Sequence, residues 1–248
     1  MKVVGVIPCR FQSSRFPGKS LALICGKPMI VHVWNQAKKA QHLDKLVVAA
    51  DDNRIYDVCC RYEIDSVLTS QTHRTGTDRV AEVAERTEGD LFVNIQGDEP
   101  LIDPVGIDNV ISGIIKTDDG PTAIANAFSI IQNTSDVLNR NVVKVITSID
   151  NYALAYSRSP IPYPKDCDAV YKRQIGLYAM RREVILKYSS LQRGYLESAE
   201  GIEMFRLLEN GYRVKMVEVP ADDSMPVDVP EDIERVELYM KLRGGRDG

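Results

Sequence analysis

The first half of the chain alternates between short apolar runs and stretches with helical spacing, and this alternation most constrains the fold. Apolar runs typical of buried strands occupy residues 2–8, 45–50, 65–68 and 91–96. Apolar side chains recur at helical spacing between them, over residues 27–40, 53–62 and 77–86. Strands that alternate with helices form a parallel sheet covered on both faces, so we expect an α/β, Rossmann-like fold. Ligands of such sheets bind beyond the carboxyl ends of the strands.

The pattern changes after about residue 118. The runs that predict strands there are 122–131, 141–148, 152–157, 174–179 and 212–219. Helices are expected over 196–210, which ends at an Asn-Gly pair, and over 231–243. Consecutive strands without a long helix between them indicate antiparallel pairing. We therefore expect a single domain over 1–248, with a smaller antiparallel subdomain at roughly 122–195.

Composition excludes several classes of protein. The net charge of −4 argues against a general nucleic-acid binder, which needs a basic surface. No apolar run approaches the ~20 residues that span a bilayer. The chain enters its first strand at once, so we expect neither a membrane segment nor a signal peptide. The five cysteines are an odd number without a Cys-x-x-Cys pair, which predicts free thiols in a reducing cytoplasm.

A basic loop follows the first strand. Residues 8–19 hold Arg10, Arg15, Lys19 and two serines, and no acidic side chain interrupts them. Cations, hydroxyls and free backbone N–H groups at the end of a strand are suited to a triphosphate. The loop lacks the Gly-x-x-x-x-Gly-Lys-Ser/Thr pattern, so it is not a Walker loop.

Two acidic residues at distant positions are candidates for a metal site. Asp98 ends the apolar strand over 91–96, and Asp228 lies between a strand and a helix. Mg²⁺ typically takes one or two protein carboxylates together with substrate phosphates. Taken alone, Asp228 is better interpreted as a helix N-cap, and it becomes a metal ligand only if the fold brings it to Asp98.

Two further segments have open interpretations. The Thr75-Gly76 turn either caps the next helix or binds the edge of a nucleobase, and the two are evenly balanced. Arg158 lies beside three prolines that hold the chain extended. A rigidly placed arginine suits a carboxylate ligand, although a surface ion pair is the common alternative.

Together these segments resemble the 3-deoxy-manno-octulosonate cytidylyltransferases, also called CMP-Kdo synthetases, where Kdo is 3-deoxy-manno-octulosonate. The resemblance covers almost the whole chain, and its motifs are residues 10–19, 26–30, 50–52, 75–79, 96–102, 141–145 and 156–162. It implies a nucleotide-diphospho-sugar transferase fold, magnesium, a cytoplasmic homodimer and a role in lipopolysaccharide biosynthesis. The implied reaction joins CMP from CTP to the anomeric hydroxyl of an acid sugar and releases pyrophosphate. The resemblance assigns sugar binding and dimerisation to the antiparallel subdomain.

The resemblance also implies roles for individual residues. The implied nucleotide contacts are Pro8, Cys9, Arg10, Ser13, Arg15, Lys19, Arg74, Thr75, Gly76 and Gln96. Asp98 and Asp228 would coordinate magnesium, and with Lys19 and Arg15 they form the implied catalytic set. The implied sugar contacts are Gln96, Arg158, Gln174, Tyr178, Glu200 and Glu203.

The sequence departs from the family at two positions on the sugar side. Gln174 stands where the family has histidine, and Met204 stands where it has glutamine. Losing a hydrogen-bonding group from a binding pocket shifts substrate preference strongly. The identity of the sugar therefore stays open between Kdo and another nonulosonic, sialic-type or amino-substituted acid. The remaining alternatives are a catalytically silent binder of CTP or CMP-sugar and a cytidylyltransferase for a neutral polyol phosphate.

Overall fold

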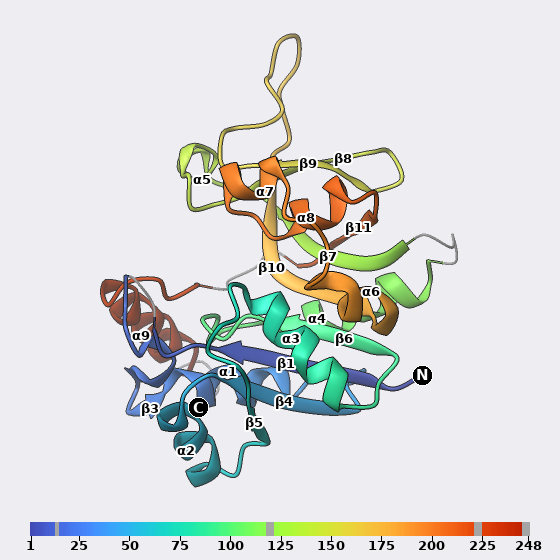
Figure 1. Cartoon of the computed structure of the whole chain (residues 1–248). Helices are drawn as coiled ribbons and strands as arrows, with labels where there is room; N and C mark the ends of the chain where they lie inside the picture. The colour runs from blue at the N-terminus through green and yellow to red at the C-terminus, as the bar shows by residue number, and fades with distance from the viewer. Residues whose placement is uncertain (13–14, 118–121, 221–224, 245–248) are drawn as a thin grey trace.

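The computed structural model describes residues 1–12, 15–117, 122–220 and 225–244 (Figure 1). The elements of the first half are β1 (Val3–Cys9), the 3₁₀ helix η1 (Lys19–Leu21), β2 (Leu23–Ile24), β3 (Lys27–Pro28), α1 (Met29–Ala37), β4 (Lys45–Ala50), α2 (Asn53–Arg61), β5 (Ser66–Leu68), α3 (Gly76–Arg86), β6 (Leu91–Ile95) and α4 (Pro104–Ile115). Those of the second half are β7 (Thr122–Ile130), α5 (Thr134–Leu138), β8 (Lys144–Thr147), β9 (Ala153–Ser157), β10 (Lys172–Arg181), α6 (Arg182–Tyr188), α7 (Tyr195–Glu200), α8 (Met204–Glu209), β11 (Arg213–Glu218) and α9 (Glu231–Gly244).

One large sheet runs through the molecule. Among the described residues its strands lie in the order β11-β7-β10-β6-β1-β4-β5. The pairs β1–β6, β1–β4 and β4–β5 are parallel, which confirms the expected α/β class. The carboxyl ends of β1, β4 and β6 therefore meet at one edge of the sheet.

The expected antiparallel part continues this sheet. Strand β10 pairs antiparallel with β6, β7 and β8, and β8 pairs antiparallel with β9. In Figure 1 the segment after β9 projects as a long loop from the top of the molecule. The α/β part and the antiparallel part thus share the strands β6 and β10 at their boundary.

Two apolar clusters bury the two faces of the sheet. Alternate residues of β1 face opposite sides: Ile7 and Cys9 join the cluster that packs under α1, α2 and α4, whereas Val4 and Val6 join the cluster under α3, α6 and α8. This alternation follows from the two-residue period of a strand. Strand β1 is consequently buried on both faces, as expected for the parallel part of a sheet.

Three expectations need correction. The helix expected over 196–210 is two short helices, because Gly201 adopts a left-handed conformation (φ 65°) that ends α7. The expected start of a helix at residue 27 is wrong, because 27–28 pair with β2 and α1 begins at Met29. Helix α4 was missed, although Pro104 at its first position and the Asp103 side chain, which accepts from the Val105 N–H, are typical of a helix start.

The other expected elements agree within a few residues at each end. In the described part of the chain, no helix has both the length and the apolar character needed to cross a membrane.

Candidate active site

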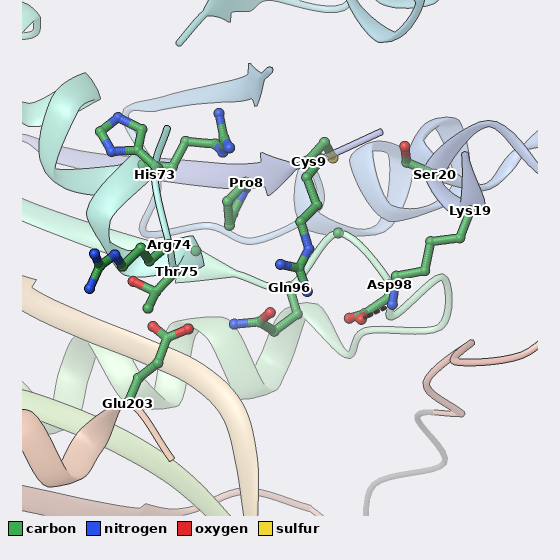
Figure 2. A pocket seen from close by; sticks show the side chains of 14 residues that line it. Pro8, Cys9, Lys19, Ser20, His73, Arg74, Thr75, Gln96, Asp98 and Glu203 are labelled. Atoms are coloured by element: carbon green, nitrogen blue, oxygen red, sulfur yellow. Dashed lines mark hydrogen bonds and ion pairs between the residues drawn. The ribbon is translucent and has the colours of Figure 1, made fainter. Parts of the chain in front are cut away.

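A pocket opens at the carboxyl ends of β1 and β6, where a parallel sheet is expected to bind its ligand (Figure 2). Its lining comes from the end of β1, the η1 turn, the start of α3, the loop after β6 and the α7–α8 connection. The residues that line it are Pro8, Cys9, Arg10, Lys19, Ser20, His73, Arg74, Thr75, Gly76, Arg79, Gln96, Gly97, Asp98 and Glu203. The structure thus brings together most of the residues expected to contact nucleotide.

Lys19 joins the two candidate metal carboxylates. Its Nζ lies 2.5 Å from Asp98 Oδ2 and 3.5 Å from Asp228 Oδ1, and it donates to the Val227 carbonyl at 3.2 Å. Arg15 Nη2 lies 2.9 Å from the same Asp228 oxygen. Two carboxylates that are distant in sequence therefore face one cation, and the set expected to be catalytic forms a single cluster.

Local structure explains how these side chains meet. Gly18 takes a left-handed conformation (φ 70°), and its N–H donates to the Phe11 carbonyl at 2.7 Å, which folds the basic loop back and presents Lys19. The Val227 N–H donates to the Asp98 carbonyl at 2.9 Å and thereby joins the two acidic segments. Asp228 does not occupy the cap position, because α9 begins three residues later at Glu231; its carboxylate pairs with Arg15 and Lys19, and its N–H donates to the Asp232 side chain at 2.9 Å.

Gly97 allows the two strand ends to approach closely. A Cβ at Gly97 would lie 2.8 Å from both the Pro8 carbonyl oxygen and Cys9 Sγ. Any side chain at this position would push the loop after β6 away from β1. Glycine is therefore required for Gln96 and Asp98 to reach the pocket beside the basic loop.

The Thr75-Gly76 turn caps a helix, as the first of its two interpretations expected, and it lies at the pocket. Thr75 Oγ1 accepts from the Asp78 N–H at 3.1 Å, and Asp78 Oδ2 accepts from the Thr75 N–H at 3.2 Å, which makes a capping box for α3. The same turn also lines the pocket. The cap orders this backbone before a ligand binds.

Two buried residues of α3 hold the loop in front of this turn. Arg79 donates to Thr69 Oγ1 at 2.5 Å and to the Ser70 carbonyl at 3.0 Å, and burial lowers the pKa of its guanidinium. Glu82 accepts from the Ser70 N–H at 2.8 Å and from His73 Nε2 at 2.5 Å. The loop that carries His73 and Arg74 into the pocket is consequently held at its start, at residues 69–70, and at His73 itself.

Glu203 reaches the pocket from the α7–α8 connection (Figure 2). Its Oε2 accepts hydrogen bonds from both the hydroxyl and the N–H of Thr77, and burial raises the pKa of its carboxyl group. Arg206 fixes this segment, because it makes a two-pronged ion pair with Glu197 (2.9 and 2.7 Å) and contacts Asp78 at 3.2 Å. The nucleotide-side turn and the segment of Glu203 are thus parts of one buried network.

The other expected sugar contacts lie on the antiparallel part and outside the lining of this pocket. Arg158 donates through Nε to the Glu200 carbonyl at 2.7 Å and through Nη1 to the Arg140 carbonyl at 2.9 Å. The Glu200 carboxylate accepts from the Ser157 hydroxyl and the Arg158 N–H, both at 2.9 Å. Glu200 therefore holds the Arg158 backbone in place.

Gln174 and Tyr178 lie together on β10. Gln174 Nε2 lies 3.3 Å from the Tyr178 hydroxyl, and burial raises the pKa of Tyr178. Met204, the second departure from the family pattern, is fully buried in the apolar cluster beneath α8 and offers no surface to a ligand.

The structure adds residues that the sequence did not single out, namely Ser20, His73, Arg79 and Gly97. Ser20 is buried, and its Oγ has no hydrogen-bond partner among the described residues. A buried hydroxyl without a partner at the wall of a pocket is suited to a ligand oxygen. Its position directly after Lys19 was the available signal. Ser13, an expected nucleotide contact, lies outside the described residues.

The chemistry of the cluster fits a divalent cation. Asp98 and Asp228 turn carboxylate oxygens toward one positive charge, and hard divalent cations bind such oxygens together with phosphate. In the described residues, no group of three or more acidic, histidine or cysteine side chains is placed to hold a metal ion. Substrate oxygens and water would therefore complete the coordination of a cation held by Asp98 and Asp228.

The cysteines provide a test of the pocket wall. Burial raises the pKa of the Cys9 thiol well above its usual value, and that of Cys59 to about 11. Both stay protonated at neutral pH, whereas Cys25, Cys60 and Cys167 are exposed. We expect titration with a disulfide reagent at pH 7.5 to give three fast thiols in the native protein and five after denaturation. Rapid labelling of Cys9, located by peptide mass, would contradict this burial.

Comparisons with known proteins agree with this geometry. The family profile described as Cytidylyltransferase matches residues 4–218. The chain is 42% identical to the 3-deoxy-manno-octulosonate cytidylyltransferase of Geotalea daltonii, over 98% of this chain and 100% of the relative. It is 42% identical to the enzyme of the same name from Solibacter usitatus, over 97% and 95% of the two chains.

Solved structures extend the comparison. A structure of CMP:2-keto-3-deoxy-manno-octonic acid synthetase complexed with CTP is similar at 37% identity and a TM-score of 0.92, over 98% of this chain and 100% of the other. The 4-diphosphocytidyl-2C-methyl-D-erythritol synthase of Anaerococcus prevotii, at 15% identity and a TM-score of 0.63 over 97% and 99% of the chains, shares the fold alone.

Proposed function

The chain belongs to the 3-deoxy-manno-octulosonate cytidylyltransferase family of nucleotidyltransferases, and from this premise we propose that it transfers CMP from CTP to the anomeric hydroxyl of Kdo, releasing pyrophosphate. The observation that carries the proposal is the cluster in which Lys19 contacts both Asp98 and Asp228 beside the pocket. A protein that only bound CTP would not need two carboxylates directed at one cation. The product is an activated sugar suited to lipopolysaccharide synthesis.

The residues of the pocket divide between the two ends of the nucleotide. The Thr75-Gly76 turn and the backbone near Pro8 and Cys9 hold the cytidine. Arg10, Arg15 and Lys19 bind the phosphates, and the unpartnered Ser20 hydroxyl adds a donor beside Lys19. Phosphoryl transfer needs little covalent help from a protein, so fixed charges and correct placement supply most of the rate.

We assign the divalent cation of this family as Mg²⁺ held by Asp98 and Asp228. When bound, Mg²⁺ supplies charge neutralisation at the phosphates and acidifies a bound hydroxyl. With the cation held by Asp98 and Asp228, the flexible side chain of Lys19 would be available to the phosphates. Lys19 and Arg15 stabilise the negative charge that develops on the leaving pyrophosphate.

Arg158 and the residues around it recognise the acid sugar. Two carbonyl contacts hold the guanidinium of Arg158, and part of its planar fork stays available for the sugar carboxylate. Gln96 and Glu203, which line the pocket, suit the hydroxyl groups of the sugar. When Arg158 holds the carboxylate of the sugar, the anomeric hydroxyl of the sugar is placed in line with the α-phosphorus of CTP.

An acid-sugar panel tests the proposed function. Pyrophosphate release is measured with CTP and Mg²⁺ against Kdo, amino-substituted Kdo, a sialic acid and a neutral polyol phosphate. We expect the highest kcat/KM with Kdo. Preference for another acid sugar would contradict Kdo as the substrate and direct attention to Gln174, where the sugar side departs from the family pattern. Absence of turnover with every sugar, despite CTP binding, would favour the silent binder.

Replacing Arg158 separates the two half-sites. We expect Arg158→Ala to raise the KM for the acid sugar about 10- to 100-fold, because a charge-assisted hydrogen bond to a carboxylate is worth about 1.5–3 kcal/mol. The Kd for CTP, measured by calorimetry, should change less than about twofold. Arg193→Ala, at an exposed arginine of the same half of the chain, is the control. Equal losses for CTP and sugar would contradict the division.

We also propose that the protein acts as a cytoplasmic homodimer. Strand β9 pairs with β8, and the residue before it, Tyr152, bridges to Lys215 of β11. Leu138, Leu154 and Tyr163 are exposed on this half of the chain. Exposed apolar side chains on one part of a chain favour contact with a second chain. Five free thiols agree with a reducing compartment that also holds CTP. Sedimentation equilibrium at micromolar concentration measures the assembly.

A further inference from the structure

Strand β10 carries an irregularity beside the pocket. Gln174 of β10 pairs with Phe128 of β7, and the next residue of β10 that pairs with β7 is Tyr178, which lies opposite Asn126. The register shifts between these pairs, so β10 has extra residues over this stretch. A bulge of this kind bends a strand and redirects its side chains, and bulges are common next to binding sites.

The side chain of Asn126 replaces the strand bonds that the bulge interrupts. Asn126 is fully buried, and its Nδ2 donates to the carbonyl oxygens of Ile175 and Leu177 at 2.8 and 3.1 Å. Its Oδ1 accepts from the Tyr156 hydroxyl at 3.1 Å and from the Gln174 amide at 3.2 Å. Carbonyl oxygens can only accept hydrogen bonds, so the amide nitrogen of Asn126 must face these two carbonyls and its amide oxygen must face the other way.

The bulge lies directly against Gln96, a residue that lines the pocket. A Cβ at Gly176 would lie 2.7 Å from Gln96 Cγ, closer than side-chain carbons pack. On its other side, Gln96 Nε2 lies 3.5 Å from Asn94 Oδ1. The Gln96 amide and the Glu203 carboxylate extend from different elements toward the same space (Figure 2). The position of Gln96 therefore depends on where the bulge holds Gly176.

We propose that Asn126 is a positioning residue for the acid sugar, which it serves by holding the β10 bulge that places Gln96 and Tyr178. This inference rests on the proposed function, because it concerns the sugar half of that reaction. Asn126 does not line the pocket. Lys19, Asp98 and the Thr75-Gly76 turn are supplied by η1, the β6 loop and the α3 cap. Gln96 is the expected nucleotide contact that lies against the bulge, so we expect the bulge to affect the sugar far more than CTP.

Two variants test the inference from opposite directions. Asn126→Ala removes the bonds that hold the bulge, whereas Gly176→Ala keeps them and displaces Gln96. A misplacement of about 1 Å at a binding site costs up to about 100-fold, so we expect the KM for the acid sugar to rise about 10- to 100-fold in each. The Kd for CTP should stay within about twofold. Ser129→Ala, at another buried polar residue of β7, is the matched control and should leave both constants unchanged.

A double-mutant cycle identifies the path of the effect. If Gly176→Ala acts through Gln96, its effect on the sugar KM should disappear in a Gln96→Ala background. Urea unfolding establishes that each variant is folded, and Gly176→Ala carries the test alone if Asn126→Ala fails to fold. An unchanged sugar KM in folded Gly176→Ala, an equal loss of CTP affinity, or additive effects in the cycle would overturn the inference.

The assay uses whichever acid sugar gives the wild type its highest kcat/KM. A wild type that prefers another acid sugar would contradict the proposed substrate and still allow the variants to be compared. A wild type that turns over no acid sugar would contradict both the proposed function and this inference.

Discussion

Asp98→Asn should lower turnover by about 10²- to 10⁴-fold while the protein stays folded. The substitution keeps the size of the side chain and removes the charge that contacts Lys19 at 2.5 Å and that would hold the metal. Loss of a preorganised charge at a phosphoryl-transfer site removes about 3–5 kcal/mol of transition-state stabilisation. Pyrophosphate release under saturating CTP and sugar measures the effect.

Stability provides the control for this variant. The Asp98 side chain is 25% exposed, so the free energy of unfolding should change by less than about 1 kcal/mol. Asp57→Asn, an exposed carboxylate on α2, should leave turnover unchanged. Near-wild-type turnover of Asp98→Asn with Mg²⁺ would refute the metal assignment.

Lys19→Met should lower kcat/KM by about 10²- to 10³-fold and weaken CTP binding. Methionine keeps the unbranched stem and removes the ammonium, which is the one group that contacts Asp98, Asp228 and the Val227 carbonyl together in the described residues. The loss combines weaker attraction of the triphosphate with weaker stabilisation of pyrophosphate. Calorimetric titration with CTP and initial-rate assays separate these two contributions.

The same variant has a second consequence in the absence of nucleotide. Removing the ammonium leaves Asp98 and Asp228 facing each other, with only Arg15 still paired to Asp228. Mg²⁺ alone should then raise the melting temperature of Lys19→Met more than that of the wild type. Lys27→Met, at an exposed lysine of β3, should behave as the wild type in both measurements. Equal stabilisation by Mg²⁺ in all three proteins would contradict a shared carboxylate site.

Much of the fold could be predicted because its signals are local. The alternating apolar residues of β1 and the helical spacing of α3 determine which faces are buried. The chemistry of the basic loop with Lys19 and of Asp98, each directly after a strand, located the pocket, since the carboxyl ends of parallel strands meet at one edge. The family resemblance added the reaction.

Other features could not be predicted because they depend on contacts between distant segments. Asp228 looked like a helix cap, but α9 begins three residues later, and the Asp228 carboxylate pairs with Lys19 and Arg15. The helix over 196–210 divides at Gly201, and the buried pair of Arg206 with Glu197 then holds the two pieces together. Gly201 was a local signal of a helix end, whereas the pairing of Asp228 with Lys19 and Arg15 has no signature within a few residues.

The amino-acid sequence by itself determined the α/β class, the basic loop after β1 and the membership of the cytidylyltransferase family, because periodicity, charge and motif spacing are properties of neighbouring residues. Only the tertiary structure decided that the Lys19 ammonium contacts both Asp98 and Asp228, that Ser20 lies at the pocket wall with its hydroxyl unpaired among the described residues, and that Asn126 supports the bulge behind Gln96. These relations depend on distances and on hydrogen-bond partners, and both are set when the folded chain brings remote segments into contact.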